Sequence, residues 1–219
     1  MRIAHSLITV ITLVCINSLI SGCQSTYYGA LEKVGIHKRD VMISRVEKTR
    51  DSQQQAKQQF QSALAQFKSV MAFDGGDLND YYQQLNDEYL ASKAAAEEVS
   101  DRIEAVESVS EALFDEWQQE LGQYTSQSLR QKSAAQLQQT RQQYRQLMRS
   151  MKRAEKSIYP VLNVFKDQTL FLKHNLNAQA IASLKGELSS IELSVDRLIT
   201  QMNRSIDSAN AFIAKMATP

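Results

Sequence analysis

The sequence predicts an all-α protein in which long antiparallel helices form an extended helical bundle or coiled coil behind a short N-terminal tether. Three observations favour this fold class. The 219 residues include only two prolines and seven glycines, so few residues interrupt a helix. Apolar residues recur at alternating spacings of three and four, which is typical of helices that pack on one another. No stretch shows the strict alternation of a β-strand bounded by turn residues.

The first residues form a leader that predicts export. Arg2 precedes an uncharged apolar run from residue 7 to residue 20, as in a secretory signal peptide. The run closes in Ile20-Ser21-Gly22-Cys23, which resembles the lipobox of bacterial lipoproteins. We therefore expect removal of residues 1–22 and attachment of a diacylglycerol to the Cys23 sulfur. A transmembrane anchor is less favoured because the run is short for the roughly 17–25 residues that span a bilayer. A structural cysteine at this place by chance is the third alternative.

Acyl chains on Cys23 predict a protein that is anchored to a membrane. Each buried CH₂ contributes about 0.8 kcal/mol, so two or three chains give stable anchoring. Gln24 follows the cysteine, whereas the inner-membrane retention signal of such lipoproteins is Asp at this position. In a Gram-negative host we expect the periplasmic face of the outer membrane. Cys23 is the only cysteine left after cleavage, which excludes an internal disulfide or a cysteine-based metal site.

Residues 23–40 are predicted to comprise the lipidated cysteine and a tether, and residues 41–219 are predicted to form a helical domain. The tether, fully extended, reaches roughly 55 Å at about 3.3 Å per residue. The first helix is expected from about Asp40 to Phe73, with a core face near its end at residues 60, 64, 67 and 71. Residues 47–59 contain no apolar residue except Ala56, so this part is expected to be thinly packed or solvent-bridging.

The second helix has the most regular repeat. Asp74-Gly75-Gly76-Asp77 predicts the turn before it, because glycine accepts positive φ. The helix is expected to run from Leu78 to about Gly122, and its apolar spacing of 4–3 persists for more than five heptads. The seam residues are Leu78, Tyr82, Leu85, Tyr89, Ser92, Ala96, Val99, Ile103, Val106, Ser110, Leu113 and Trp117.

Two further helices follow the same rule. The third is read from Leu137 to Asn175 after a turn at residues 123–128, and the fourth from Ile181 to Met216 after a turn at residues 174–178. Pro160 interrupts the third helix, and the register continues across it, which favours a kink over a reversal. Four helices joined by short turns predict an antiparallel bundle.

Charge predicts which helices pair. Residues 74–120 hold 14 acidic and 2 basic side chains, whereas residues 130–156 hold 8 basic and 1 acidic. These two faces are expected to meet, and collectively such charges set pairing and direction. Without Arg2 the mature chain has 24 basic and 24 acidic side chains, so no net charge attracts nucleic acid. We expect no nucleic-acid partner.

The search for catalytic chemistry points away from an enzyme. HExxH, CxxC, GxSxG and GxxxxGK are absent from the sequence, although each has a defined role in a known class of site. Adjacent carboxylates such as Glu97-Glu98 lie on a strongly acidic helix and are interpreted as solvated. His174 alone does not make a metal site. We predict a non-enzymatic protein with no cofactor, no metal and no small-molecule substrate.

Two stretches carry more features than a bundle needs and are candidate interaction sites. The first includes His37, Lys38 and Arg39, where an N-terminal helix cap at Asp40 is the structural alternative. The second is residues 159–178, whose apolar residues cover more than one seam. Its alternatives are bundle core, a docking face for another protein, or a patch that rests on lipid. The candidate residues in it are Val164, Phe165, Phe171, Leu172 and His174.

A resemblance covers nearly all the mature chain. The lipobox, KVGIHKRD at residues 33–40 and PVLNVFKDQTLFLKHNLN at residues 160–177 together resemble a family of uncharacterised Gram-negative lipoproteins, known as a domain of unknown function. The resemblance implies an envelope location and a mostly helical fold, and it implies no activity.

These observations favour an anchored helical scaffold or adaptor in the periplasm, attached to the membrane through Cys23. Regular heptads predict helix–helix burial and a protein partner or self-association. The alternative is a membrane-active or lipid-binding protein whose helices open and lay their apolar faces on lipid.

Overall fold

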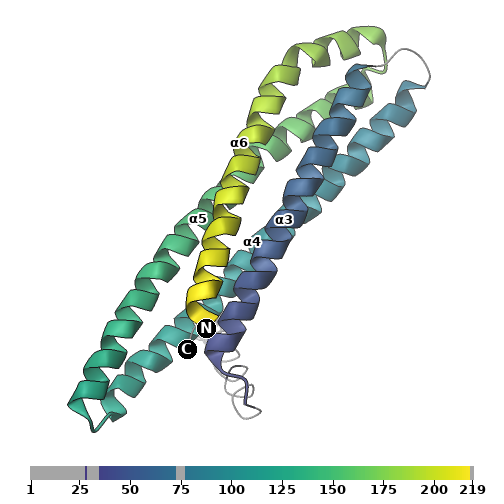
Figure 1. Ribbon diagram of the computed structural model, residues 1–219. Helices are drawn as coiled ribbons and strands as arrows, with labels where there is room; N and C mark the ends of the chain where they lie inside the picture. The colour runs from purple at the N-terminus through teal and green to yellow at the C-terminus, as the bar shows by residue number, and fades with distance from the viewer. Residues whose placement is uncertain (1–27, 29–34, 73–76, 218–219) are drawn as a thin grey trace, which may run out of the picture.

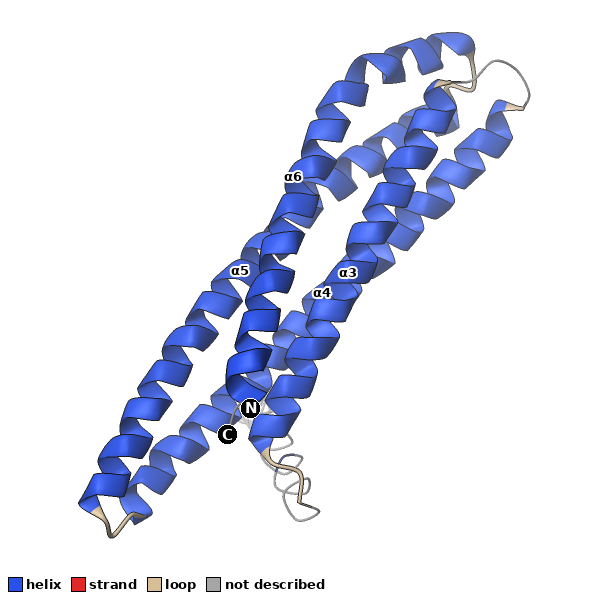
Figure 2. Ribbon diagram, viewed as in Figure 1, coloured by secondary structure: helices blue, strands red, loops and turns tan. Residues whose placement is uncertain are grey.

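The computed structural model describes Tyr28, residues 35–72 and residues 77–217. Cys23 and the leader lie outside these residues. The described part consists of four long helices and one 3₁₀ turn, without strands (Figures 1 and 2). The prediction of an all-α protein is confirmed. The elements, labelled as in Figure 1, are α3 (Lys38–Met71), α4 (Leu78–Glu120), η1 (Leu121–Gln123), α5 (Gln127–His174) and α6 (Ala178–Ala217).

The four helices form an antiparallel bundle, as expected. α3 packs against α4 and α6, and α5 packs against the same two helices, so α3 and α5 lie diagonally across the core. At one end, α4 and α5 extend past the beginning of α3 and the end of α6 as a two-helix hairpin (Figure 1). The bundle therefore thins from four helices to two at the η1 end.

Large apolar side chains fill the core of the four-helix part. Phe60 of α3 and Phe165 of α5 stack across the bundle centre with ring centroids 6.0 Å apart. Phe67, Ile103 and Leu172 are also fully buried. Burial of such a side chain contributes about 1.5–3 kcal/mol, which explains why the seam holds the four helices together.

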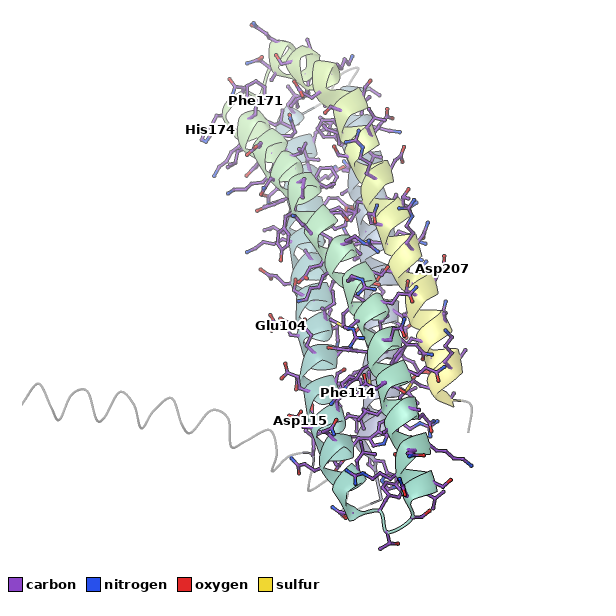
Figure 3. All side chains as sticks on the ribbon, turned by 90° about the vertical axis from the view of Figure 1, so that its left-hand side faces the viewer. Glu104, Phe114, Asp115, Phe171, His174 and Asp207 are labelled. Atoms are coloured by element: carbon purple, nitrogen blue, oxygen red, sulfur yellow. The ribbon has the colours of Figure 1, made fainter. Side chains whose placement is uncertain are left out.

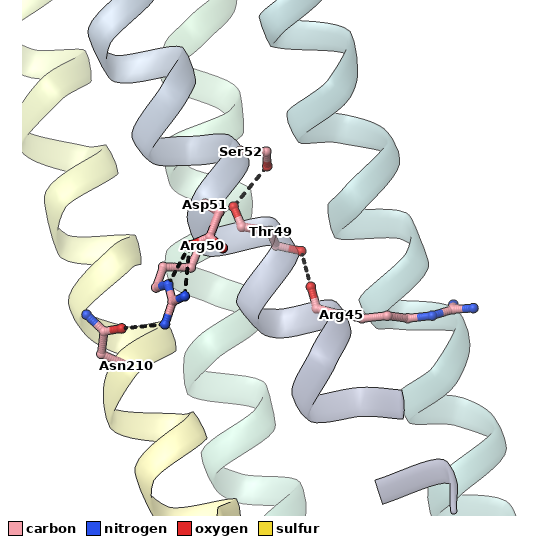
Figure 4. Close-up of polar contacts among 6 residues, drawn as sticks. All are labelled: Arg45, Thr49, Arg50, Asp51, Ser52 and Asn210. Atoms are coloured by element: carbon pink, nitrogen blue, oxygen red, sulfur yellow. Dashed lines mark hydrogen bonds and ion pairs between the residues drawn. The ribbon is translucent and has the colours of Figure 1, made fainter. Parts of the chain in front are cut away.

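The polar middle of α3 packs more closely than its composition suggests. Thr49 and Ser52 are buried, and their hydroxyls donate to backbone carbonyls of Arg45 and Thr49 at 2.8 and 2.9 Å (Figure 4). Arg50 donates to Asn210 of α6 at 3.4 Å. Small hydroxyl residues satisfied by their own helix therefore allow α3 to approach its neighbours here.

Buried Gln53, one turn further along α3, has no such side-chain hydrogen bond. It is 0% exposed, and neither its amide nitrogen nor its amide oxygen has a hydrogen-bond partner among the described residues. An unsatisfied buried amide costs free energy, so this position weakens the middle of the bundle.

Local signals explain the helix ends. Asp77 caps α4 by accepting from the Asn79 N–H at 2.8 Å, and Ser126 caps α5 by accepting from the Leu129 N–H at 3.4 Å. These caps satisfy backbone donors that have no partner inside the helix. α5 starts ten residues before its first seam residue and continues through Pro160 without a break. The chain thus keeps its direction at this proline, as the continuous register indicates.

The oppositely charged helices α4 and α5 are neighbours, as predicted. Lys152 of α5 forms an ion pair with Glu107 of α4 at 3.2 Å. Other inter-helix pairs among the described residues involve α3: Lys38 with Glu116 at 2.7 Å and Lys68 with Glu192 at 2.5 Å. Ion pairs are thus distributed over three helix contacts rather than concentrated between the two charged segments.

Candidate interaction surfaces

The first turn of α3 joins three helices at the η1 end of the bundle. His37 occupies the N-cap position without a side-chain cap bond. Lys38 pairs with Glu116 of α4, and Arg39 donates from Nε to the Met216 carbonyl of α6 at 3.1 Å, with a second contact from Nη2. Two of the three candidate residues, Lys38 and Arg39, therefore connect the beginning of α3 to α4 and α6. His37 is exposed.

A groove of about 710 Å³ lies beside this junction, where α3 and α6 stop and the hairpin continues. We call it the hairpin groove. Its α5 side is a helical stripe with spacings of 4, 3, 4 and 3, which is the spacing of the bundle seams. The stripe consists of Leu129, Ser133, Gln136, Thr140 and Gln143. The α4 side and the bundle floor are formed by Leu113, Glu116, Trp117, Glu120, Tyr124, Arg39, Lys215 and Met216, with Gln139 at the edge.

The same α5 stripe touches α6 further up the bundle. Gln143, Gln146 and Leu147 line a depression together with Phe212 and Lys215 of α6. The hairpin groove is therefore the continuation of the α6 track past the end of α6.

Aromatic side chains brace the hairpin from within. Trp117 Nε1 donates to the Ser133 hydroxyl at 2.8 Å, and the Tyr124 hydroxyl donates to the same oxygen at 3.5 Å. Further up, Phe114 and Tyr144 pack edge to face with centroids 5.3 Å apart, and Arg141 lies 5.6 Å from the Phe114 ring centre. The hydrogen bond of Trp117 therefore connects the α4 and α5 sides of the hairpin groove and holds the indole in one orientation.

Two titratable groups between α4 and α5 are perturbed. Burial raises the pKa of Tyr144 above 10.0, and the charges of Glu107 and Glu111 act in the same direction. Burial works to lower the pKa of Lys152, but its hydrogen bond with Glu107 and the charge of Glu155 outweigh it and raise that pKa above 10.5. Both groups stay in their usual protonation state near neutral pH, so neither indicates acid–base catalysis.

The second predicted stretch is divided between core and surface. Phe165 and Leu172 are fully buried, Val164 is half-buried, and Phe171 is 40% exposed. Figure 3 shows Phe171 and exposed His174 at the far end of α5, away from the hairpin. Leu170 and Leu176 are also exposed at this end. Three exposed apolar residues, Leu170, Phe171 and Leu176, thus lie close in sequence near this end of the bundle, and we call them the apolar tip.

The described residues contain no group of three or more His, Cys, Asp or Glu side chains placed to hold a metal ion. Glu104 and Asp115 point outward from α4 in Figure 3, so these acidic side chains do not converge. None of the described helices combines the length and hydropathy that a bilayer crossing needs.

Sequence reasoning did not identify the hairpin groove. Trp117 was predicted as a seam residue and Leu129 was not singled out. A signal was nevertheless present, because the second helix was expected to continue to about Gly122 while its neighbour begins near residue 40. Both helices rise by the same distance per residue, so the longer second helix extends past the beginning of the first. Its last turns could therefore have been expected to have no contact with the first helix.

Comparison with known proteins identifies a family without an assigned role. Residues 27–216 match a family described as a protein of unknown function, DUF2959. The chain belongs to this family, which agrees with the resemblance to an uncharacterised family. No curated protein and no solved structure matches the chain.

Proposed function

We propose that this protein is a lipid-anchored, non-enzymatic adaptor of the cell envelope, and that its hairpin groove binds a helix of a partner protein. Acyl chains on Cys23 hold it at the periplasmic face of the outer membrane. The observation that carries the proposal is the hairpin groove: two helices continue their seam spacing beyond the ends of the two helices that cover it elsewhere.

The geometry of the groove favours a helical occupant. Gln143 and Leu147 line a depression together with α6, and the stripe from Leu129 to Gln143 continues past the end of α6 by four positions. A helix placed there packs its ridges into the same grooves that α6 uses. This is the helix-in-groove mode of recognition, in which side chains at i, i+3, i+4 and i+7 anchor the partner.

The side chains of the groove describe the partner's chemistry. Leu113, Trp117 and Met216 supply an apolar centre, and glutamine amides form one edge. Glu116, Glu120, Arg39 and Lys215 add both signs of charge to the lining. An apolar centre with a polar rim is typical of protein interfaces that form and dissociate. We expect a partner helix with a narrow apolar stripe flanked by amide and charged side chains.

A second candidate function rests on the apolar tip. Leu170, Phe171 and Leu176 are each exposed by 40% or more, and such residues insert into lipid headgroups. The lipid-binding alternative therefore uses the end of the bundle opposite the hairpin groove. It ranks second because the remaining apolar residues of this stretch, including Phe165 and Leu172, are committed to the core.

Anchoring is tested by Cys23→Ser. The variant should leave the membrane fraction or accumulate with its leader attached, because no sulfur remains to carry a diacylglycerol. Cys15→Ser, which changes the other cysteine, is the matched control and should fractionate as the unaltered protein. Mature Cys23→Ser protein that stays in the membrane fraction would contradict the anchor.

Groove binding is tested by introducing positive charges at exposed positions of the stripe. Leu129→Lys with Gln136→Lys adds two cations to the groove, and Gln131→Lys with Gln138→Lys adds two cations to exposed positions outside it on the same helix. The adaptor proposal predicts that one discrete envelope protein co-isolates with the wild type and the control but not with the groove variant. Identical sets of co-isolated proteins from all three would contradict it.

A further inference from the structure

Tyr28 attaches the predicted tether to the bundle far from the tip of the hairpin. Its hydroxyl oxygen lies 3.1 Å from the Ser108 hydroxyl oxygen of α4. The Arg45 guanidinium of α3 lies 5.4 Å from the Tyr28 ring centre, and Arg45 also donates to the Ala105 carbonyl at 2.7 Å. The hydrogen bond to Ala105 fixes the Arg45 guanidinium near the Tyr28 ring, and this cation–π contact stabilises the packing of the ring. Tyr28 is 1% exposed.

Because Tyr28 is held against the bundle, only the chain between Cys23 and Tyr28 can act as a tether. Four residues separate Cys23 from Tyr28, and the five Cα–Cα steps between them, at about 3.3–3.6 Å each, reach at most about 18 Å. The headgroup layer accounts for about 6 Å of that distance, since it is the difference between the hydrocarbon core and the whole leaflet. An anchor at Cys23 therefore holds the Tyr28 backbone within about 12 Å of the headgroup surface.

An upright bundle exceeds this limit in either direction. Ser108 lies 12 residues from the η1 end of α4 and 30 residues from its beginning. At 1.5 Å per residue these are about 18 Å and about 45 Å along the helix. A bundle that stands on its hairpin lifts Ser108, and the Tyr28 hydroxyl beside it, at least about 18 Å above the lipid, and one that stands on its other end lifts them about 45 Å.

We infer that the bundle lies along the membrane with its α3/α4 flank facing the lipid. By α3/α4 flank we mean the surface formed by Ile36, Val41, Arg45 and Lys48 on one side and by Ala105 and Ser108 of α4 on the other. Exposed Glu104 lies one helical turn before Ser108 on α4. The inference rests on the proposed acylation of Cys23 and specifies how the anchored protein is oriented. The partner of this surface is the bilayer that holds the acyl chains.

The surface chemistry of the flank suits a headgroup layer. A depression of about 410 Å³ beside Tyr28 is lined by exposed Ile36 and Lys48 together with Arg45, Arg102 and Asp40. The three cations and one carboxylate of this lining give a small net positive charge, which at about 1 kcal/mol per cation is too little for strong attraction to an anionic surface. The short tether, rather than net charge, fixes the orientation.

The orientation has a consequence for the hairpin groove. A side-on bundle holds the groove close to the lipid surface instead of projecting it across the periplasm. Partner helices are then taken from proteins at the same membrane, or from segments that emerge directly next to it.

The experiment uses the acylated full chain in phosphatidylcholine vesicles that contain a headgroup-linked acceptor dye. Because Cys23 carries acyl chains, an engineered cysteine is the only reactive thiol of the mature protein. Donor dyes are placed at Glu104→Cys on the α3/α4 flank and at Ala211→Cys, which lies beside the depression between α5 and α6. The mass of the Cys23 peptide is measured on the same preparation.

Side-on orientation predicts at least about twofold higher energy transfer from position 104 than from position 211, because a four-helix bundle is about 20 Å across. Tyr28→Ala should abolish this asymmetry by freeing the longer tether, whereas Tyr28→Phe should keep most of it because the ring still packs on Arg45. Equal transfer from both positions on acylated protein would overturn the orientation alone. A Cys23 peptide without acyl chains would overturn the proposed anchor and the orientation together.

Discussion

The four-helix part of the bundle and the hairpin at its η1 end follow the same 3–4 spacing but fill it with different side chains. In the four-helix part the seam holds Phe60, Phe165 and Leu172, all fully buried. In the hairpin the corresponding stripe of α5 holds Leu129, Ser133 and Gln136 and lines an open groove. Spacing therefore determines which face of a helix meets another helix. The size and polarity of the side chains, together with the lengths of the neighbouring helices, determine whether that face is core or binding surface.

Truncation of the central aromatic stack should separate the two regions most strongly. Phe165→Ala removes the ring that stacks on Phe60 at 6.0 Å and should lower the free energy of unfolding by about 3–5 kcal/mol, measured in urea. Leu129→Ala, at a residue that is 54% exposed in the groove, should change it by less than about 0.5 kcal/mol. Equal losses would mean that the hairpin is packed as tightly as the core.

Replacement of the buried amide should have the opposite sign. Gln53→Leu fills the same space without two unsatisfied polar atoms and should raise the free energy of unfolding by about 1–2 kcal/mol. Gln55→Leu, at an exposed position of the same helix, is the control and should have almost no effect. A loss of stability for Gln53→Leu would show that the amide is hydrogen-bonded within the core.

Alkaline pH should weaken the contact between α4 and α5 by a smaller amount. The pKa of Tyr144 and that of Lys152 are both raised in the folded protein, so the unfolded chain releases these protons first. Their contribution to stability is complete below pH 10 and is lost as pH rises through the folded pKa values. Urea unfolding at pH 8, 9.5 and 10.5 should show this decline, and Tyr144→Phe should flatten it. A Tyr144→Phe curve parallel to that of the wild type would remove Tyr144 from this account.

Much of the fold could be predicted because the repeat is long and rarely interrupted. The helix from Leu78 was predicted to end near Gly122 and ends at Glu120, because its seam is continuous up to that point. The beginning of α5 was less accessible to sequence reasoning, because residues 127–136 carry no apolar repeat and the Ser126 cap alone marks the start. Polar residues that form a helix without a buried seam leave little periodic signal.

The candidate surfaces were harder to predict, because they depend on where neighbouring helices stop. Lys38 and Arg39 were predicted as part of an interaction site, whereas the structure shows them binding α3 to α4 and α6. Phe165 and Phe171 belong to one apolar stretch, yet one is core and the other is exposed. Packing of Tyr28 on Arg45 involves residues 17 apart in sequence with no periodic relation. Only the folded arrangement brings such residues together.

The hairpin groove is proposed to receive a helix from another protein at the membrane. The most direct test is photo-cross-linking in living cells, with a photoreactive amino acid at Gln136 in the groove and, as control, at exposed Gln138 outside it. The account predicts an adduct from position 136 alone, whose cross-linked peptide comes from one envelope protein and carries apolar residues at spacings of three and four. Adducts of equal yield from both positions, or adducts from position 136 only to lipid or to a second copy of this chain, would contradict it.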